Sequence, residues 1–268
     1  MHDWFDSPPG RYLLEWEQSR FDEAVADVFG YHSLQLGMPM LEGLRTNRMP
    51  HRWLALGSER NAGVPVSSGM APAAPTAAPV VHLRTHAVAL PFANASLDLL
   101  VLPHTLELSH DPHAALREVA RVLVPEGRVV ISGLNPASLW GLRQGRLRLQ
   151  ERWGGGRLYL PQAGEFIAPW RLRDWLRLLD FEVGEMQFGC YRPAVRTQKW
   201  LDRLAWMDGV GERCWPILGA AYFVVAIKRV HGMRLLEPAW RSGRQRVAGT
   251  VPVASRAAGA TWTDRQDV

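Results

Sequence analysis

Residues 89–136 read ALPFANASLDLLVLPHTLELSHDPHAALREVARVLVPEGRVVISGLNP and contain the most regular succession of elements in the chain. LDLLVLP (97–103) is a continuous apolar run, which is typical of a strand buried on both faces. The segment 111–123 predicts a helix, with Asp111 as its N-cap and a proline at its first position. A second buried strand is predicted at 128–134. Strand, helix and strand with short joints indicate a parallel sheet with a right-handed crossover.

The segments on either side extend the same pattern. An amphipathic helix is predicted at 11–29, and HRWLALG (51–57) reads as a short strand, the first of the sheet. Further along, 169–181 predicts a helix, and strands are predicted at 181–189 and 220–230.

These elements suggest three regions. Residues 1–49 are predicted to form an N-terminal helical cap, with a second helical piece within 31–44. Residues 50–232 are predicted to form the α/β domain, interrupted at about 58–79 by a flexible insertion rich in Ala, Pro, Gly and Ser. The composition of residues 233–268 is typical of a disordered tail.

Composition narrows the class of protein. Of the 268 residues, 47% are hydrophobic, which is enough for a large core and argues against global disorder. The N-terminus lacks the basic start and apolar run of a signal peptide, and no segment offers about 20 apolar residues. We therefore expect a cytoplasmic protein without membrane insertion. The net charge of +5 gives only loose attraction to polyanions.

A series of polar residues follows the first buried strand at intervals of three: His104, Glu107, His110 and His113. This spacing resembles a set of metal ligands. On a helix, however, each step of three residues turns the side chain by about 300°, so the ends of the series would face opposite sides. Pro112 also marks a helix start within the series. We therefore predict no metal site here.

The same residues lie where a ligand site is expected. In open parallel sheets, ligands bind at the carboxyl ends of the strands. His104 and Glu107 follow one predicted strand, and Asn135 and Trp140 follow the next, so a pocket between them is predicted. An alternative for Asn135 and Ser138 is that they cap the following helix.

The ordered motifs of this region resemble class I S-adenosylmethionine-dependent methyltransferases of the type 11 domain family. The motifs that match, in the family's order, are Leu90-Pro91-Phe92, Leu97-Asp98, Leu106-Glu107, Asp111-Pro112, Arg121-Val122-Leu123 and Pro125-Glu126-Gly127. The resemblance covers about residues 50–230. It implies an α/β, Rossmann-like, seven-stranded and mostly parallel sheet with helices on both faces and the last strand antiparallel.

The resemblance also implies S-adenosylmethionine as the cofactor, with no metal. It assigns cofactor contacts to Gly57, His86, Ala87, Pro103 and His104. The chain departs from the family in three places. Of the glycine-rich loop only Gly57 is matched, no acidic residue that would hold the ribose hydroxyls is identifiable, and His86 stands where the family has Asp near the adenine.

The predicted function is methyl transfer from S-adenosylmethionine to an acceptor that the sequence does not identify. His104 is the candidate general base, because a histidine pKa lies near neutrality. Glu107, Asn135 and Trp140 are the predicted pocket residues. The alternative is an inactive binding protein that keeps the fold and has lost the cofactor. RNA is a weaker candidate partner, through the arginines 143, 146, 148, 152 and 157.

Overall fold

The structure, a computed structural model, describes residues 2–57, 80–151, 159–160 and 166–230. The predicted insertion at 58–79 and the predicted tail at 233–268 lie outside these residues. The elements follow in this order: α1 (His2–Phe5), α2 (Pro8–Ala26), β1 (His32–Leu36), β2 (His51–Gly57), β3 (Val80–Thr85), β4 (Leu97–Pro103), α3 (Thr105–Leu108), α4 (Pro112–Val122), β5 (Leu123–Leu134), α5 (Leu139–Glu151), α6 (Pro169–Leu178), β6 (Phe181–Gly189), α7 (Gln198–Arg203), α8 (Trp206–Cys214), the 3₁₀ helix η1 (Pro216–Leu218) and β7 (Ala221–Lys228).

Seven strands form one sheet in the order β3-β2-β1-β4-β5-β7-β6. β1 pairs in parallel with β2 and β4, and parallel pairing continues outward to β3 and β5. β7 is antiparallel to both of its neighbours, β5 and β6. The predicted α/β, Rossmann-like fold with an antiparallel last strand is thus confirmed.

The position of the first strand corrects the prediction. Residues 51–57 form β2, and the first strand is β1, which lies inside the predicted helical cap (1–49) and replaces the helical piece expected within 31–44. The domain boundary at residue 50 is therefore wrong. The pattern hides β1 because two of its buried side chains, Ser33 and Gln35, are polar, whereas strands buried on both faces usually read as continuous apolar runs.

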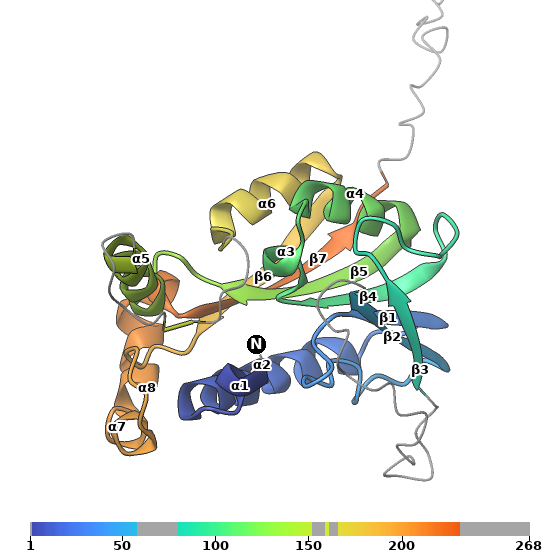
Figure 1. Ribbon diagram of the computed structural model, residues 1–268. Helices are drawn as coiled ribbons and strands as arrows, with labels where there is room; N and C mark the ends of the chain where they lie inside the picture. Colours follow the sequence, from blue (N-terminus) through green and yellow to red (C-terminus); the bar gives the residue numbers. More distant parts are fainter. Residues whose placement is uncertain (1, 58–79, 152–158, 161–165, 231–268) are drawn as a thin grey trace, which may run out of the picture. The chain divides into compact units, whose positions relative to one another are not determined.

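Helices cover both faces of the sheet (Figure 1), with α3, α4 and α6 on one face and α1 and α2 on the other. On the first face, Leu116 of α4 and Leu172 of α6 belong to the same buried cluster as Leu102 of β4. On the second face, Phe21 of α2 lies edge-on to Phe223 of β7, with ring centroids 4.9 Å apart. Burial on both faces supplies the main stabilising term of the fold.

The helix start predicted after β4 is confirmed. The Asp111 carboxylate accepts a hydrogen bond of 2.9 Å from the Ala114 N–H, and Pro112 occupies the first position of α4. The N-cap satisfies a backbone donor that the helix itself leaves unpaired. A loop of fixed length therefore connects the end of β4 to α4, with the short helix α3 inside it.

Candidate functional site

The parallel strands bring the predicted cofactor residues to one edge of the sheet. Gly57 ends β2 and is exposed, and a Cβ placed on it would meet no described atom within 4 Å. After β3, His86 is exposed and Ala87 half-buried. At the end of β4, Pro103 and His104 are both buried. Among the described residues, the edge is thus exposed near β2 and β3 and covered near β4.

The loop after the first strand begins at Gly37, so the prediction that Gly57 belongs to this loop is wrong. Gly37 has a φ of +83°, a backbone conformation that favours glycine. The buried amide of Gln35 organises the loop: it donates to the carbonyl oxygens of Gly37 (3.3 Å), Met38 (3.0 Å) and Leu41 (2.6 Å) and accepts from the Gly43 N–H (2.9 Å). The loop is therefore held by a side chain of β1.

A buried charged cluster lies at the end of β4. The Nδ1 atom of His104 is 3.0 Å from Oε2 of Glu107, and its Nε2 atom is 2.8 Å from Oε1 of Glu17 in α2. The other oxygen of Glu107 accepts a hydrogen bond from the backbone N–H of Leu134 in β5. The cluster therefore connects α2, the loop after β4 and the end of β5.

The cluster fixes the charge of His104. Burial alone would lower the pKa of this imidazole, but Glu17 and Glu107 outweigh burial and raise the pKa to about 10. Burial raises the pKa of Glu107 above its usual range, opposed by the interaction with His104. An imidazole held between two carboxylates is protonated at neutral pH and cannot accept another proton. This arrangement contradicts the predicted role of His104 as a general base.

The charge state predicts a pH dependence of stability. In an unfolded chain the pKa of histidine is about 6.5, whereas that of His104 in the folded protein is about 10. The stability that protonated His104 contributes is therefore complete below about pH 6.5 and is lost as the pH rises through about 10. In urea denaturation, the free energy of unfolding should fall between pH 7 and pH 10 by more in the natural protein than in His104→Gln. Equal losses in the two proteins would contradict this charge state.

Glu17 is the site residue that the sequence analysis missed. It is fully buried on the inner face of α2, four residues from Leu13 and four from Phe21, which are also fully buried. An acidic residue in the middle of an apolar helical stripe was the available signal. Within the described residues, its Oε2 atom has no hydrogen-bond partner. Burying a carboxylate oxygen without a hydrogen-bond donor is unfavourable, so Oε2 marks a place for a second donor or cation beside His104.

The predicted pocket residues have structural partners. Asn135 accepts from the Ala137 N–H (3.1 Å) and donates to the carbonyl oxygens of Ile217 (2.8 Å) and Gly219 (3.0 Å). The capping alternative holds for Ser138, whose hydroxyl oxygen accepts a hydrogen bond from the Gly141 N–H (3.1 Å) in the first turn of α5. Trp140 is 1% exposed, and its indole N–H donates to the Arg192 carbonyl oxygen (2.8 Å). Together with Glu107 they form the buried support of this edge, and a direct contact with an acceptor stays a prediction.

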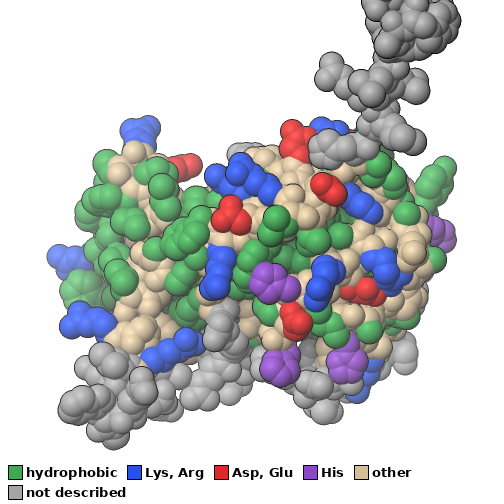
Figure 2. All heavy atoms as spheres, turned by 90° about the horizontal axis from the view of Figure 1, so that it is seen from above, with side chains coloured by type: hydrophobic (Ala, Val, Ile, Leu, Met, Phe, Trp, Pro, Cys, Tyr) green, Lys and Arg blue, Asp and Glu red, His purple; other side chains and the backbone are tan. Residues whose placement is uncertain are grey.

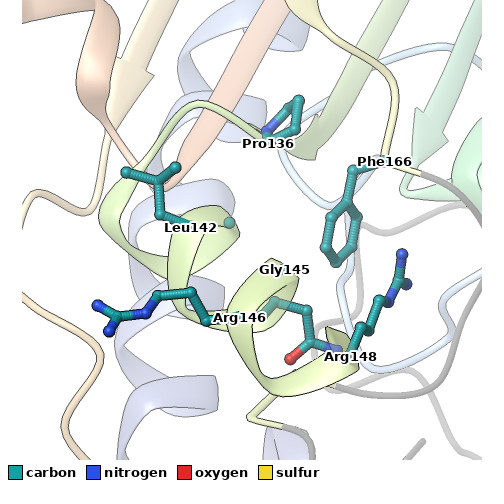
Figure 3. A pocket seen from close by; sticks show the side chains of 8 residues that line it. Pro136, Leu142, Gly145, Arg146, Arg148 and Phe166 are labelled. Carbon is teal, nitrogen blue, oxygen red and sulfur yellow. The ribbon is translucent and has the colours of Figure 1, made fainter. Parts of the chain in front are cut away.

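An open groove adjoins the end of β5 (Figure 3) and has a volume of about 590 Å³. In Figure 3, Arg148 lies beside Phe166, and the guanidinium carbon is 5.3 Å from the ring centroid. The groove thus combines apolar and cationic walls. Its lining residues are Pro136, Gly141, Leu142, Gln144, Gly145, Arg146, Arg148 and Phe166.

The outer members of the histidine series lie apart from the cluster. His110 and His113 are exposed, and the His113 ring lies against Trp175 with centroids 3.9 Å apart. Across the described ranges, His, Cys, Asp and Glu side chains form no group that could hold a metal ion. The helices in the same part of the chain are all too short or too polar to cross a bilayer.

A family model and a protein of Escherichia coli match the sequence. Residues 45–131, which run from before β2 into β5, match the type 11 family model described as "Methyltransferase domain". Over 180 residues the chain is 31% identical to an Escherichia coli (strain K12) protein described as "Uncharacterized protein YafS". The match covers 67% of this chain and 65% of that relative, so the chain spans just under two thirds of the relative's length.

Comparisons of the structure show the same fold. A Thermotoga maritima protein described as an S-adenosylmethionine-dependent methyltransferase, "possible histamine N-methyltransferase", superimposes with a TM-score of 0.53 at 16% identity, covering 81% of this chain and 92% of that one. A Haloferax volcanii structure described as a complex between the Trm112 methyltransferase activator and "the putative methyltransferase" gives a TM-score of 0.54 at 16% identity, covering 86% of this chain and 96% of that one. Residues 45–131 therefore match the type 11 methyltransferase domain model, within a chain that has the fold of class I S-adenosylmethionine-dependent methyltransferases.

Proposed function

We propose that the chain binds S-adenosylmethionine at the carboxyl edge of β1 and β4 and transfers its methyl group to an acceptor. The observation that carries this proposal is the buried Oε2 atom of Glu17, which has no hydrogen-bond partner among the described residues. It lies at the strand end where the family resemblance places the cofactor. The family domain and the strand order support methyl transfer in general.

The cofactor's charge fits this place. S-adenosylmethionine carries a sulfonium and an ammonium group in its methionine part, and both are complementary to a buried carboxylate. Gly37 has a φ of +83°, which favours glycine, and this conformation lets the backbone turn tightly after β1, where the ligand is proposed. We assign Pro103 and His104 to this methionine side, with His104 as a positioning residue that orients Glu17.

The adenosine side of the site fits less completely. Gly57 is open to a ligand, and His86 and Ala87 stand at the end of the neighbouring strand. Among the described residues, none at the end of β2 supplies the carboxylate that would take the ribose hydroxyls. We therefore assign these three residues to the adenosine part as backbone and ring contacts.

The reaction requires mainly orientation from the protein. When bound, the cofactor supplies a methyl group activated by its positively charged sulfur. The protein's part is to hold acceptor and methyl in line and to exclude water, which alone gives large rate effects. Because His104 is already protonated, the acceptor needs a nucleophile that is reactive without this histidine as a base. The groove beside Pro136 is the proposed place of the acceptor.

The proposal places this reaction in the cytoplasm. Both cysteines are free thiols, Cys190 buried and Cys214 exposed, which agrees with a reducing compartment.

The location of the site can be tested by ultraviolet cross-linking of methyl-labelled S-adenosylmethionine to the full chain, followed by peptide mapping. We expect label in peptides that contain residues 37–57 or 103–107 and its displacement by the demethylated product. Label that is spread over the chain, or that the product does not displace, would contradict the proposed site. Loss of all specific labelling would favour the inactive alternative.

Glu17→Gln should weaken S-adenosylmethionine binding at least about tenfold in equilibrium dialysis, since a hydrogen bond to a charged group contributes about 1.5–3 kcal/mol. Glutamine keeps the shape of the side chain and removes the charge. Glu15→Gln is the matched control, because Glu15 is exposed on the same helix. Circular dichroism would establish that both variants are folded at the assay temperature. Equal affinities of the two variants would remove Glu17 from the site.

A further inference from the structure

Exposed apolar side chains gather on the elements that follow β5 and β6. Among the described residues, seven of the thirteen large hydrophobic side chains that are exposed belong to α5, α7, α8 and η1 with its preceding residue. They are Leu139, Leu142, Trp200, Trp206, Trp215, Ile217 and Leu218. Three are tryptophans and four are aliphatic. We call residues 139–148 of α5 together with residues 190–218, which run from the end of β6 through α7, α8 and η1, the α5–α8 surface.

The α5–α8 surface is held together by side-chain hydrogen bonds to backbone. Asn135, before α5, donates to the carbonyl oxygen of Ile217 in η1. Trp140 of α5 donates to Arg192, and the Tyr191 hydroxyl donates to the Pro216 carbonyl oxygen (2.8 Å). Figure 1 draws α5, α7 and α8 at the same end of the sheet. Their exposed side chains therefore belong to one fixed part of the fold.

The charge of this surface is strongly positive. Residues 139–148 and 190–218 contain eight basic and three acidic side chains, a net charge of +5, which equals the net charge of the entire chain. Figure 2 shows hydrophobic side chains gathered at this end, with Lys and Arg side chains around them. The remaining residues therefore balance to zero net charge, and the basic excess is concentrated where the apolar side chains are exposed.

Three classes of partner could cover such a surface. Single-stranded RNA would contact the arginines through its phosphates and stack its bases on the tryptophans, but it would leave four aliphatic side chains exposed. A protein interface also concentrates tryptophan and arginine, but its centre is depleted of the net charge that this surface carries. A bilayer with anionic lipids matches both features, because tryptophan and aliphatic side chains enter the headgroup boundary while basic residues contact the lipid charge.

We infer that the α5–α8 surface binds the surface of an anionic lipid bilayer without spanning it. The groove at Pro136 is lined by the α5 part of this surface, with Leu142, Arg146 and Arg148 in its walls. Resting on the proposed function, the inference also gives the acceptor a class: a lipid-borne amphiphile whose anionic group contacts the groove arginines. β5 and β6 end at the same edge as β1 and β4, so the bound membrane would lie next to the methyl-transfer site.

Vesicle co-sedimentation of the full chain, without cofactor, tests the surface. The probes are vesicles of phosphatidylcholine alone and of phosphatidylcholine mixed equally with phosphatidylglycerol. We expect binding to the anionic vesicles at least about tenfold stronger than to the neutral ones, weakening as salt is added. The tryptophan emission should shift to shorter wavelength on binding, because three exposed indoles enter an apolar environment.

Two double variants separate the contributions. Trp206→Ser with Ile217→Ser removes apolar contact, and Arg146→Glu with Arg213→Glu reverses charge; each should weaken vesicle binding at least about tenfold. The matched control is Trp170→Ser with Leu178→Ser, since these side chains of α6 are 58% and 81% exposed on another part of the fold. This control should bind vesicles like the natural protein.

Three results would overturn the inference. The first is no binding to anionic vesicles at low salt. The second is a loss of vesicle binding in the α6 control that equals the loss in the surface variants. The third is tight binding of a single-stranded RNA oligonucleotide that the surface variants lose while vesicles are not bound at all. Because no cofactor is present, these outcomes are independent of whether the chain binds S-adenosylmethionine.

Discussion

His104→Ala should lower the free energy of unfolding by about 3–5 kcal/mol, which is the usual effect of removing one partner of a buried ion pair. The variant leaves Glu17 and Glu107 buried with no cation between them, so their carboxylates then repel each other. It also removes the link between α2 and the end of β4. Urea denaturation at pH 7, followed by circular dichroism, measures the change.

The control for this variant is His110→Ala. His110 lies six residues further along the same loop region and is exposed, so its replacement should change stability by no more than about 0.5 kcal/mol. If His104→Ala costs less than about 1 kcal/mol, the imidazole is not held between two charges. The double variant of His104→Ala with Glu17→Gln measures the coupling between the two residues. Its loss of unfolding free energy should differ clearly from the sum of the two single losses, because the residues share one interaction.

Gln35→Leu should destabilise the protein by about 3–5 kcal/mol, although leucine is apolar and similar in size. The Gln35 side-chain amide donates to the carbonyl oxygens of Gly37, Met38 and Leu41, and it accepts a hydrogen bond from the N–H of Gly43. Each buried backbone group left without a partner costs about 1–3 kcal/mol. The loop can relax in part, so the total loss should be smaller than the full cost of all four groups. The same denaturation experiment measures the loss.

Gln198→Leu is the matched control for Gln35→Leu. Gln198 is exposed at the start of α7, where its amide bonds only an exposed Asp202 among the described contacts, so about 0.5 kcal/mol or less is expected. A similar small effect for Gln35→Leu would mean that the loop after β1 does not depend on this side chain. Since Gly37 begins that loop, the variant should also bind S-adenosylmethionine more weakly at temperatures where it is folded.

The sequence was sufficient for the central part of the fold. The apolar run at 97–103, the Asp111 cap and the strand after the helix identified β4, α4 and β5, because local signals and burial agree there. The sequence also predicts correctly that Trp140 follows the end of β5. Its orientation into the core depended on the Arg192 carbonyl oxygen, a partner 52 residues away that no local pattern contains.

The first strand was missed for a physical reason. Gln35 is polar because it holds the following loop, so β1 lacks the apolar continuity of a central parallel strand. As a consequence, the loop that follows the first strand was placed after Gly57 rather than after Leu36. A polar residue inside a buried strand usually has a specific hydrogen-bond partner. The partners of Gln35 are backbone groups of the loop that follows β1.

The charged cluster could be predicted only in part. His104 and Glu107 are three residues apart, and their position after a strand marked them as site residues. Glu17 is 87 positions before His104, and only its place between two apolar residues of a helix distinguished it. The pKa of His104 depends on this long-range contact, so the role of general base could not be judged from the sequence.

Titration calorimetry of the full chain with S-adenosylmethionine, and separately with its demethylated product, measures directly whether the chain binds the cofactor. We expect saturable heat with one site per chain for both ligands, and weaker binding in Glu17→Gln than in Glu15→Gln. A dissociation constant of 1 mM corresponds to only about 4 kcal/mol, so ligand at that concentration detects even weak binding. No saturable heat with either ligand at about 1 mM would contradict cofactor binding by this chain.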